Sequence, residues 1–168
     1  SASAQPLWVE SGIAGRPSLS FDGAAQFLLS PAIDLPQGNT VFLLYSRTGA
    51  QGTRFIYDSQ TSAGRITYFT LSATQVDHYF EDPGGTAKQI VATRTVSTTG
   101  ELAVCQYNGG SSLLRLNTVQ SNAAYSATTA TVPVGMTLGA RFTQTLFWSG
   151  QIALVIVVLM CILALLGG

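Results

Sequence analysis

Charged side chains are scarce in this sequence. They make up 10% of its 168 residues, whereas soluble domains carry about 25%. The eight basic and eight acidic residues cancel, so electrostatics gives no basis for binding nucleic acid or an acidic membrane surface. Histidine occurs once and cysteine twice, which leaves too few ligands for a zinc site. We therefore expect neither a nucleic acid partner nor bound zinc.

Helix-forming residues are also sparse outside the C-terminal end. β-branched and aromatic residues recur throughout, and 35 serines and threonines supply the polarity that charge does not. This composition favours an all-β protein. The length predicts one domain with a sizeable core.

The two cysteines, Cys105 and Cys161, can form at most one disulfide, and the sequence leaves their pairing open. Cys105 lies in an apolar stretch of strand character, which favours a free, buried thiol. The chain begins with the small residues Ser1-Ala2-Ser3-Ala4 rather than with Met. We therefore expect a processed product or a part of a longer chain.

Residues 101–117 carry the clearest structural pattern. Two apolar runs, 102–107 and 113–116, flank an Asn-Gly-Gly-Ser-Ser segment whose Asn and Gly tolerate the positive φ of a tight reversal. Leu114 and Leu116 share one face, with Arg115 between them, as in a half-buried strand. The pattern predicts a β-hairpin, and we expect it at the centre of an antiparallel sheet.

Further strand patterns recur at intervals of about ten residues, which is typical of a β-sandwich or jelly roll. The run 40–46 is almost continuously apolar, so it predicts a central strand covered on both faces. Asp22-Gly23 predicts a turn, and the polar stretch 118–131 predicts a long loop. Besides the hairpin, we expect strands at 18–21, 27–29, 40–46, 54–58, 65–72, 74–80, 88–96, 136–142 and 152–158.

Five segments together resemble the concanavalin A-like lectin/glucanase superfamily, in its laminin-G-like branch; they are 17–23, 40–45, 102–117, 138–141 and 147–153. The shared pattern is an early F-D-G, a strand-turn-strand ending in L-x-x-N, and a closing G-x-I-A strand. The resemblance implies an all-β, two-sheet antiparallel jelly-roll sandwich. It predicts an irregular N-terminal arm at 1–15, the jelly-roll domain at 16–158 and an apolar tail at 159–168.

The chain departs from the family pattern in two places. Relatives carry an acidic residue and then a Tyr-Asn turn after the closing I-A, where this chain has Leu154 and Val158-Leu159. Relatives also carry an early strand with a tryptophan before F-D-G. Either that strand is missing here, or Leu7-Trp8-Val9 takes its place.

The family includes glycoside hydrolases, but the catalytic residues are not apparent. These enzymes need two carboxylates across the scissile bond. The family presents them in an E-x-D-x-E type run, which Glu10, Glu81 and Glu101 do not form. A Ser-His-Asp triad would require His78, whose neighbour Asp77 points to the opposite face of a strand. We therefore expect no enzymatic activity.

Calcium is the family's usual cofactor and is held by carboxylates and carbonyl oxygens. The aspartates considered as ligands, Asp22, Asp58, Asp77 and Asp82, form no D-x-D cluster, and each can instead cap a turn. No cofactor is expected, and calcium is the alternative.

A glycan site needs exposed aromatic rings that stack on a sugar, with hydrogen-bonding groups beside them. The residues that can supply these are Asp77, His78, Tyr79, Asp82 and Trp148. In the alternative interpretation, Tyr79 or Phe80 faces the core and Trp148 plugs one end of the sandwich. For Trp148 we favour the plug.

Residues 152–166 are apolar without interruption. As a helix they would span about 22 Å, which is short against about 30 Å of hydrocarbon, and the run is too long for one ordinary strand. We divide it into a closing strand at 152–158 and a tail that must bury against the sandwich, a neighbouring subunit or lipid. The expected contacts are Leu159, Met160, Ile162, Leu163, Leu165 and Leu166.

These observations predict a non-catalytic module on an extracellular or virion surface, which binds a glycan or a neighbouring shell protein. By family analogy, the preferred setting is a phage virion, as capsid decoration or in tail adhesion. A bacterial cell-surface lectin-like module tethered by its C-terminus is the alternative, and a glycoside hydrolase is third. Expected partners are further copies of the chain, capsid or tail proteins, and cell-surface glycan. Protein burial of the tail is favoured over a membrane contact.

Overall fold

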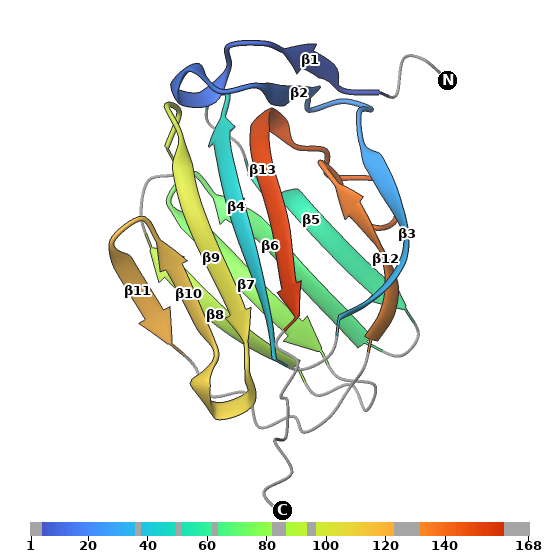
Figure 1. The fold of residues 1–168 in the computed structure, drawn as a ribbon, viewed down its shortest axis with the longest axis vertical. Coiled ribbons are helices and arrows are strands. Elements are labelled where there is room, and N and C mark those ends of the chain that lie inside the picture. The colour runs from blue at the N-terminus through green and yellow to red at the C-terminus, as the bar shows by residue number, and fades with distance from the viewer. Residues whose placement is uncertain are drawn as a thin grey trace, which may run out of the picture.

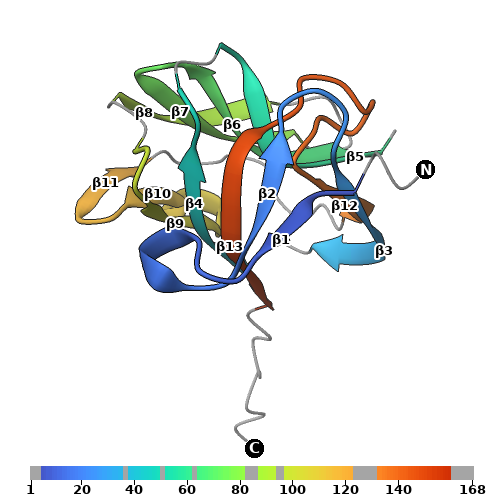
Figure 2. The same ribbon diagram turned by 90° about the horizontal axis from the view of Figure 1, so that it is seen from above.

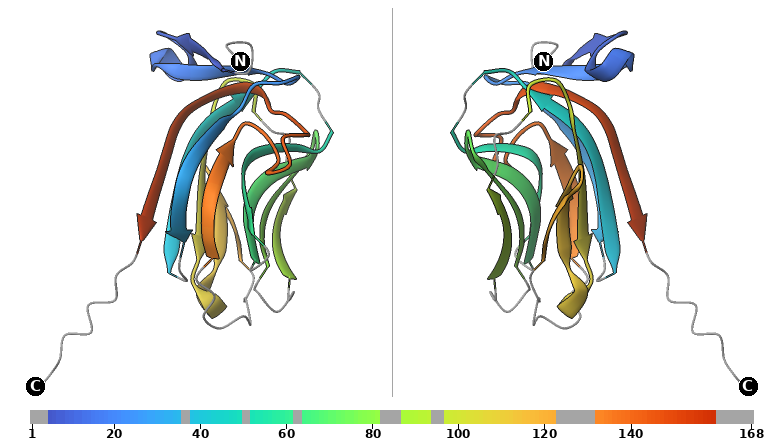
Figure 3. Two further views of the ribbon diagram at one scale, coloured as in Figure 1. Left: turned by 90° about the vertical axis from the view of Figure 1, so that its right-hand side faces the viewer. Right: turned by 90° about the vertical axis from the view of Figure 1, so that its left-hand side faces the viewer.

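The computed structural model describes residues 5–35, 38–49, 52–61, 64–81, 87–93, 97–122 and 132–159. Within these ranges the chain is all-β, with two 3₁₀ turns (η2, Ile13–Gly15; η3, Gly109–Ser111) and no α-helix. Two antiparallel sheets pack face to face, as in a jelly-roll sandwich (Figures 1 and 3). The predicted fold class is confirmed.

The first sheet has seven strands and the second has six, and the view from above shows them as separate layers (Figure 2). In spatial order, the seven-stranded sheet contains β1 (Leu7–Val9), β2 (Ser18–Asp22), β13 (Ser149–Leu159), β4 (Asn39–Arg47), β9 (Glu101–Tyr107), β10 (Leu113–Leu116) and β11 (Val119–Asn122). The six-stranded sheet contains β3 (Leu28–Leu35), β12 (Val132–Leu138), β5 (Arg54–Thr61), β6 (Gly64–Ser72), β7 (Gln75–Glu81) and β8 (Ala87–Thr93).

The predicted hairpin is formed by β9 and β10, with η3 at its turn. Leu114 and Leu116 are completely buried and Arg115 is exposed, as the alternation predicted. In the turn, Gly109 has a positive φ of 50°, whereas Asn108 has a φ of −151°. The hairpin lies toward one side of the seven-stranded sheet, whose middle strand is β4. The prediction that the hairpin is central is therefore wrong.

Strand β4 is the middle of its sheet but has only one covered face. Val41, Leu43 and Tyr45 point inward and are completely buried. Phe42 and Leu44 point to the outer face and are half-buried. The continuous apolar run thus does not reflect burial on both faces, because the outer face of this sheet is itself apolar.

Aromatic side chains dominate the core between the sheets. Its largest completely buried members are Trp148, Tyr45, Tyr57, Tyr68, Tyr107 and Phe80. Phe80 of one sheet stacks on Tyr107 of the other, with ring centroids 3.9 Å apart. Cys105 is also buried in this core as a free thiol, and burial raises its pKa. Cys161, the other cysteine of the pairing that the sequence left open, lies outside the described residues.

The closing G-x-I-A segment has a steric reason for its glycine. Gly150 lies where β13 pairs with both β2 and β4. It has a φ of 149°, and a Cβ there would overlap the carbonyl oxygen of Ser46. Only glycine allows the two backbones to approach this closely.

Several segments differ from their predicted structure. Leu7–Val9 forms β1 and pairs with β2, where an irregular arm was expected. Val119–Asn122 forms an edge strand rather than a loop; its polar residues give no hydrophobic period. Strand β12 ends at Leu138, four residues earlier than predicted, because Gly139 follows with a φ of 78°.

The end of the apolar run is only partly described. Strand β13 continues to Leu159, one residue beyond the predicted division. The tail contacts predicted for Met160, Ile162, Leu163, Leu165 and Leu166 lie outside the described residues. In the part that the structure describes, no helix has the length and apolarity to cross a membrane.

Candidate functional site

The structure separates the five residues predicted to form a glycan site. Asp77, His78 and Trp148 are completely buried, whereas Tyr79 is half-buried on β7. Asp82 lies outside the described residues. Because buried side chains offer no surface to a sugar, only Tyr79 remains available for direct contact among the four described residues.

His78 is a core residue. Its strand neighbours at alternate positions, Val76 and Phe80, both belong to the hydrophobic core, and in register it lies between Tyr68 and Ile90. Burial lowers its pKa to about 4, so the imidazole is neutral at physiological pH. Asp77 lies on the opposite face of the strand, as the alternation predicted.

Trp148 is completely buried in the core between the sheets. Its ring meets that of Tyr45 edge to face, with centroids 5.8 Å apart and an interplanar angle of 79°. Phe80, adjacent to Tyr79, faces the core. Two of the three aromatic residues considered at the sequence level therefore stabilise the fold.

Tyr79 instead joins a group of polar side chains on the outer face of the six-stranded sheet. Its hydroxyl donates to Oε2 of Glu81 at 2.8 Å. The guanidinium of Arg65, on the neighbouring strand β6, lies over the Tyr79 ring at 5.7 Å from the centroid. Burial, together with the Glu81 carboxylate, raises the pKa of Tyr79 to about 12. The phenol therefore stays protonated and can act as a hydrogen-bond donor.

Arg65 is held in place from the opposite side by Asp58. Its Nε and Nη2 donate to Oδ1 and Oδ2 of Asp58, each at 2.9 Å. The backbone N–H of Phe142 donates to the same carboxylate at 2.9 Å. A bidentate pair of this kind fixes the plane of the guanidinium, so the cation is preorganised beside Tyr79.

Asp77 fixes two amide side chains on the same face. The amide nitrogens of Gln89 and Gln75 donate to Oδ1 of Asp77, at 2.6 Å and 3.2 Å. Burial raises the pKa of Asp77 above its ordinary value. Gln89 is exposed and Gln75 is half-buried, so this buried acid positions amide groups that reach the surface.

We call this surface the polar–aromatic face; it consists of Arg65, Gln75, Asp77, Tyr79, Glu81 and Gln89. The register places Tyr79 opposite Gln89 on β8, and Glu81 opposite Arg65 on β6. The face combines one aromatic ring with guanidinium, amide and carboxylate groups. These are the groups with which a protein can bind the hydroxyls and the apolar face of a sugar ring.

Sequence reasoning identified Asp77 and Tyr79 but missed Arg65, Gln75 and Gln89. The signal that could have found them was alternation. Gln75, Asp77, Tyr79 and Glu81 occupy every second position of one strand, which predicts a single polar side. That Arg65 and Gln89 lie beside them depends on the pairing of β6, β7 and β8, which is not visible in local sequence.

The acids considered as calcium ligands or catalysts have other roles. Oδ1 of Asp22 accepts from the backbone N–H groups of Ala24 and Ala25, at 2.8 and 3.1 Å, and these bonds lower its pKa. Glu101 is buried and accepts from the hydroxyl of Tyr45. Within the described ranges, no three His, Cys, Asp or Glu side chains form a group that could hold a metal ion.

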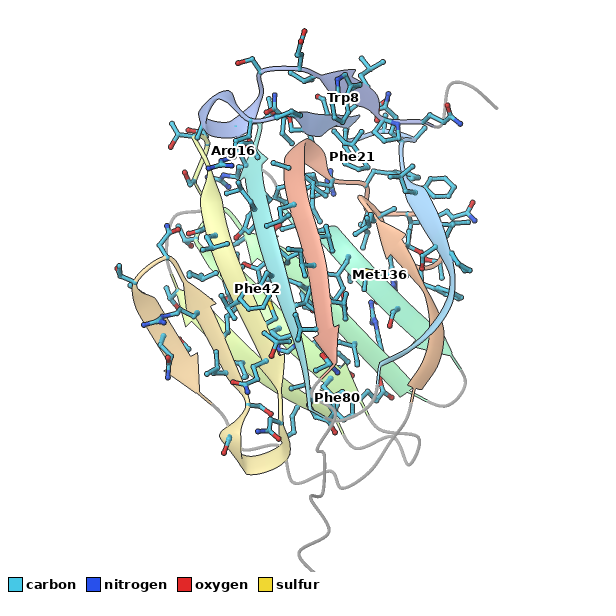
Figure 4. The ribbon with its side chains drawn as sticks, viewed as in Figure 1. Trp8, Arg16, Phe21, Phe42, Phe80 and Met136 are labelled. Atoms are coloured by element: carbon cyan, nitrogen blue, oxygen red, sulfur yellow. The ribbon has the colours of Figure 1, made fainter. Side chains whose placement is uncertain are left out.

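A hollow lies between the β1–β2 arm and strands β13, β4 and β9 of the same sheet. It is a pocket of about 700 Å³, whose lining includes Trp8, Arg16, Leu44, Leu102 and Leu154. Figure 4 shows Trp8 and Arg16 at this end of the molecule, on the arm above the strands. Its walls are mostly apolar, and Arg16 and Ser18 are the only polar side chains among its described lining residues, so it offers few hydrogen-bonding groups to a sugar.

Comparison with solved structures identifies the fold. The chain is similar to domains LG4-5 of the mouse laminin α1 chain (TM-score 0.68, 17% identity, 91% of this chain and 43% of that one). It is also similar to the carbohydrate-binding module CBM40 of a Ruminococcus gnavus sialidase (0.60, 12%, 77% and 90%). A third is the heptameric SAP-like pentraxin of Limulus polyphemus (0.59, 13%, 83% and 74%).

The protein has the concanavalin A-like jelly-roll fold. The chain spans less than half of the two-domain laminin structure. No protein-family model matches the sequence, and no curated protein matches it. At these sequence identities the similarity establishes the fold but does not identify a ligand.

Proposed function

We propose that this protein is a non-catalytic binding module that recognises a glycan through the polar–aromatic face. The observation that carries the proposal is the preorganised arrangement around Tyr79. Its ring and hydroxyl are positioned by Arg65 and Glu81, and the neighbouring amides are positioned by Asp77. Side chains that are fixed before binding lose little conformational entropy when a ligand arrives.

The similar structures support this choice of ligand class. The CBM40 module of the R. gnavus sialidase is also known bound to α2,3-sialyllactose. An acidic sugar of that type would be attracted to the Arg65 guanidinium, whereas Glu81 and Asp77 would repel it. We therefore propose that the ligand is a neutral glycan, whose hydroxyls donate to the Glu81 carboxylate and accept from the amides.

The proposed setting is outside the cell, on a virion or a cell surface. The low charge and the high content of serine and threonine support it. Of the two settings we favour a phage virion, in capsid decoration or tail adhesion, over a tethered bacterial surface module. Labelled protein should then adsorb to intact bacterial cells, and prior digestion of the surface glycan should abolish the adsorption.

A glycan array with the full chain tests the ligand class. We expect binding to neutral glycans, and at least a tenfold weaker binding for Tyr79→Ala and for Gln89→Ala. Both side chains lie at the surface, so the melting temperatures of these variants should stay close to that of the wild type. The matched control is Gln120→Ala on the edge strand β11 of the other sheet, which should bind like the wild type.

Absence of glycan binding by the wild-type chain would contradict the proposal. Equal loss of binding in Gln120→Ala would also contradict it, because the effect would not be specific to this face. Release of reducing sugar from a bound oligosaccharide would show that the protein is an enzyme and not a non-catalytic module.

A further inference from the structure

The outer face of the seven-stranded sheet carries a continuous group of apolar side chains. The pairing of β13 with β4, and of β4 with β9, arranges them in transverse rows. The first row is Leu154–Leu44–Leu102, and the second is Ile156–Phe42–Val104. In the third, Val158 lies beside Thr40 and Gln106. We call the seven apolar members of these rows the apolar patch; Phe42 lies near its middle (Figure 4).

The apolar patch is unusual for a solvent-facing sheet. An antiparallel sheet with one face in water normally alternates apolar inward and polar outward residues. Here Leu154, Ile156 and Val158 are 38%, 45% and 43% exposed. When the second row is followed from β13 through β4 and β9, the next residue is Arg115 of β10, which pairs with Val104. It is the first charged side chain in that row. A contiguous exposed patch of this kind marks an interaction surface.

The lower half of β13 also has an open edge. Strand β2 pairs with β13 only from Ser149 to Ile152 (Figure 1), whereas β4 pairs with it as far as Leu159. From residue 153 to 159, no other described strand pairs with the side of β13 that faces away from β4. Natural proteins protect such edges with charges, prolines or bulges, and residues 154–159 contain neither charge nor proline.

The sequence that follows β13 has the composition of another buried strand. Residues 160–166 read Met-Cys-Ile-Leu-Ala-Leu-Leu. No Gly, Pro, Asn, Asp or Ser occurs from residue 152 to 166, so nothing favours a reversal that would bring this segment back onto its own edge. Its seven residues equal the seven of the open edge at 153–159.

We propose that the open edge is the docking site for residues 160–166 of a second copy of this chain. In the resulting dimer, each copy's segment 160–166 pairs antiparallel with the 153–159 edge of the other. The two-fold axis then lies between residues 159 and 160, so Val158 of one copy faces Cys161 of the second copy. This exchange pairs the open edges of both copies. It limits the assembly to two copies, because each copy buries the same surface in the dimer and leaves none for a third copy.

The sheet continues through the dimer axis, so the open edge of β13 is paired along its whole length. Its outward residues gain the exchanged strand's apolar side chains as lateral neighbours on the same face of the sheet. The apolar run 152–166 is thus a single strand whose first half belongs to its own sandwich and whose second half completes the other one.

Analytical ultracentrifugation of the full chain tests the proposal. We expect a dimer for the wild type and monomers for Val158→Lys and Leu163→Lys, which place a charge in the exchanged strand or in its docking edge. Val119→Lys, at a 54% exposed position of β11 in the same sheet, is the matched control and should stay dimeric. Circular dichroism should show that all four proteins keep the β-sandwich fold.

Disulfide cross-linking tests the pairing itself. With oxidised glutathione, Val158→Cys should form a covalent dimer through Cys161 of the second copy, and adding Cys161→Ser should abolish it. Ile156→Cys should not cross-link, because it faces Leu163 of the second copy. The thiol of Cys105 is completely buried and does not compete.

A monomeric wild type would overturn the proposal, as would a dimer that survives both lysine substitutions. A monomer that floats with phosphatidylcholine vesicles would show that lipid, and not a second copy, binds the apolar run 152–166. None of these results bears on the glycan proposal, which concerns the opposite sheet.

Discussion

The phenolic oxygens of Tyr45 and Tyr68 lie 2.7 Å apart in the core and join the two sheets. Tyr45, on β4, donates to Oε2 of Glu101 at 2.8 Å. Its single proton is thereby used, so Tyr68, on β6, must be the donor to Tyr45. Burial raises the pKa of both phenols, which keeps them protonated. A polar chain in a dry core is costly unless each member is satisfied.

Removing the Tyr68 hydroxyl and removing the Tyr45 hydroxyl should therefore lower the unfolding free energy by different amounts. Tyr68→Phe removes one neutral hydrogen bond and should cost about 1 kcal/mol of unfolding free energy. Tyr45→Phe leaves both the Tyr68 hydroxyl and the Glu101 carboxylate without that partner, so it should cost about 2–3 kcal/mol. Urea unfolding measures both.

Tyr79→Phe serves as the control for the tyrosine series, because its hydroxyl lies at the half-buried surface. It should change the unfolding free energy by less than about 0.5 kcal/mol. Equal costs at Tyr45 and Tyr68 would show that the two hydroxyls do not act in the donor order described above.

The buried imidazole of His78 should make stability fall in mild acid. Its pKa is about 4 in the folded protein, against 6.5 in the unfolded chain. Between these values the unfolded chain binds the proton and the folded protein does not, so the unfolding free energy decreases as the pH falls from 6.5 toward 4. At about 1.4 kcal/mol per pKa unit, the loss approaches about 3 kcal/mol.

Comparison with His78→Met isolates this effect. Asp77, whose pKa is raised, acts in the opposite direction above pH 3.8, but it is present in both proteins and cancels in the difference. Urea unfolding at several pH values should give a steeper loss for the wild type than for the variant. Parallel curves would contradict the assignment of a neutral, buried His78.

Gly150, where β13 pairs with β4, should not tolerate substitution. Gly150→Ala would place a Cβ against the Ser46 carbonyl oxygen and 2.7 Å from Cα of Arg47, so it should cost more than about 3 kcal/mol. Gly110→Ala is the control, since a Cβ there has no neighbour within 4 Å. A Gly150→Ala protein that melts within a few degrees of the wild type would show that the two strands can separate locally.

Local sequence patterns were sufficient to predict the strands and turns whose structure depends on neighbouring residues. The alternation of Leu114, Arg115 and Leu116 predicted which side of β10 is buried. Asp22-Gly23 predicted a turn, and Asp22 caps it with its own carboxylate. These features depend on residues close in sequence, whose conformational preferences act within a few positions. The polar edge strand β11 escaped prediction because an exposed strand needs no apolar period.

The candidate site required the tertiary structure. Tyr79 was selected from the sequence, but so were His78 and Trp148, whose rings lie in the core. An aromatic residue is suited both to core packing and to ligand binding, so its identity does not distinguish the two roles. The role depends on whether the ring faces the other sheet or the surface. The partners of Tyr79 come from three different strands: Arg65 from β6, Glu81 from β7 itself and Gln89 from β8.

The sequence by itself determined an all-β chain, most of its strands and an apolar C-terminal run. Strand order and register were decided only by tertiary structure, because β13 lies between β2 and β4, more than a hundred residues earlier in the chain. Pairing between strands so far apart in the sequence depends on how the faces of the two sheets pack, and it cannot be read from local sequence. That packing decided which face of the sheet presents Tyr79, and left the edge of β13 open.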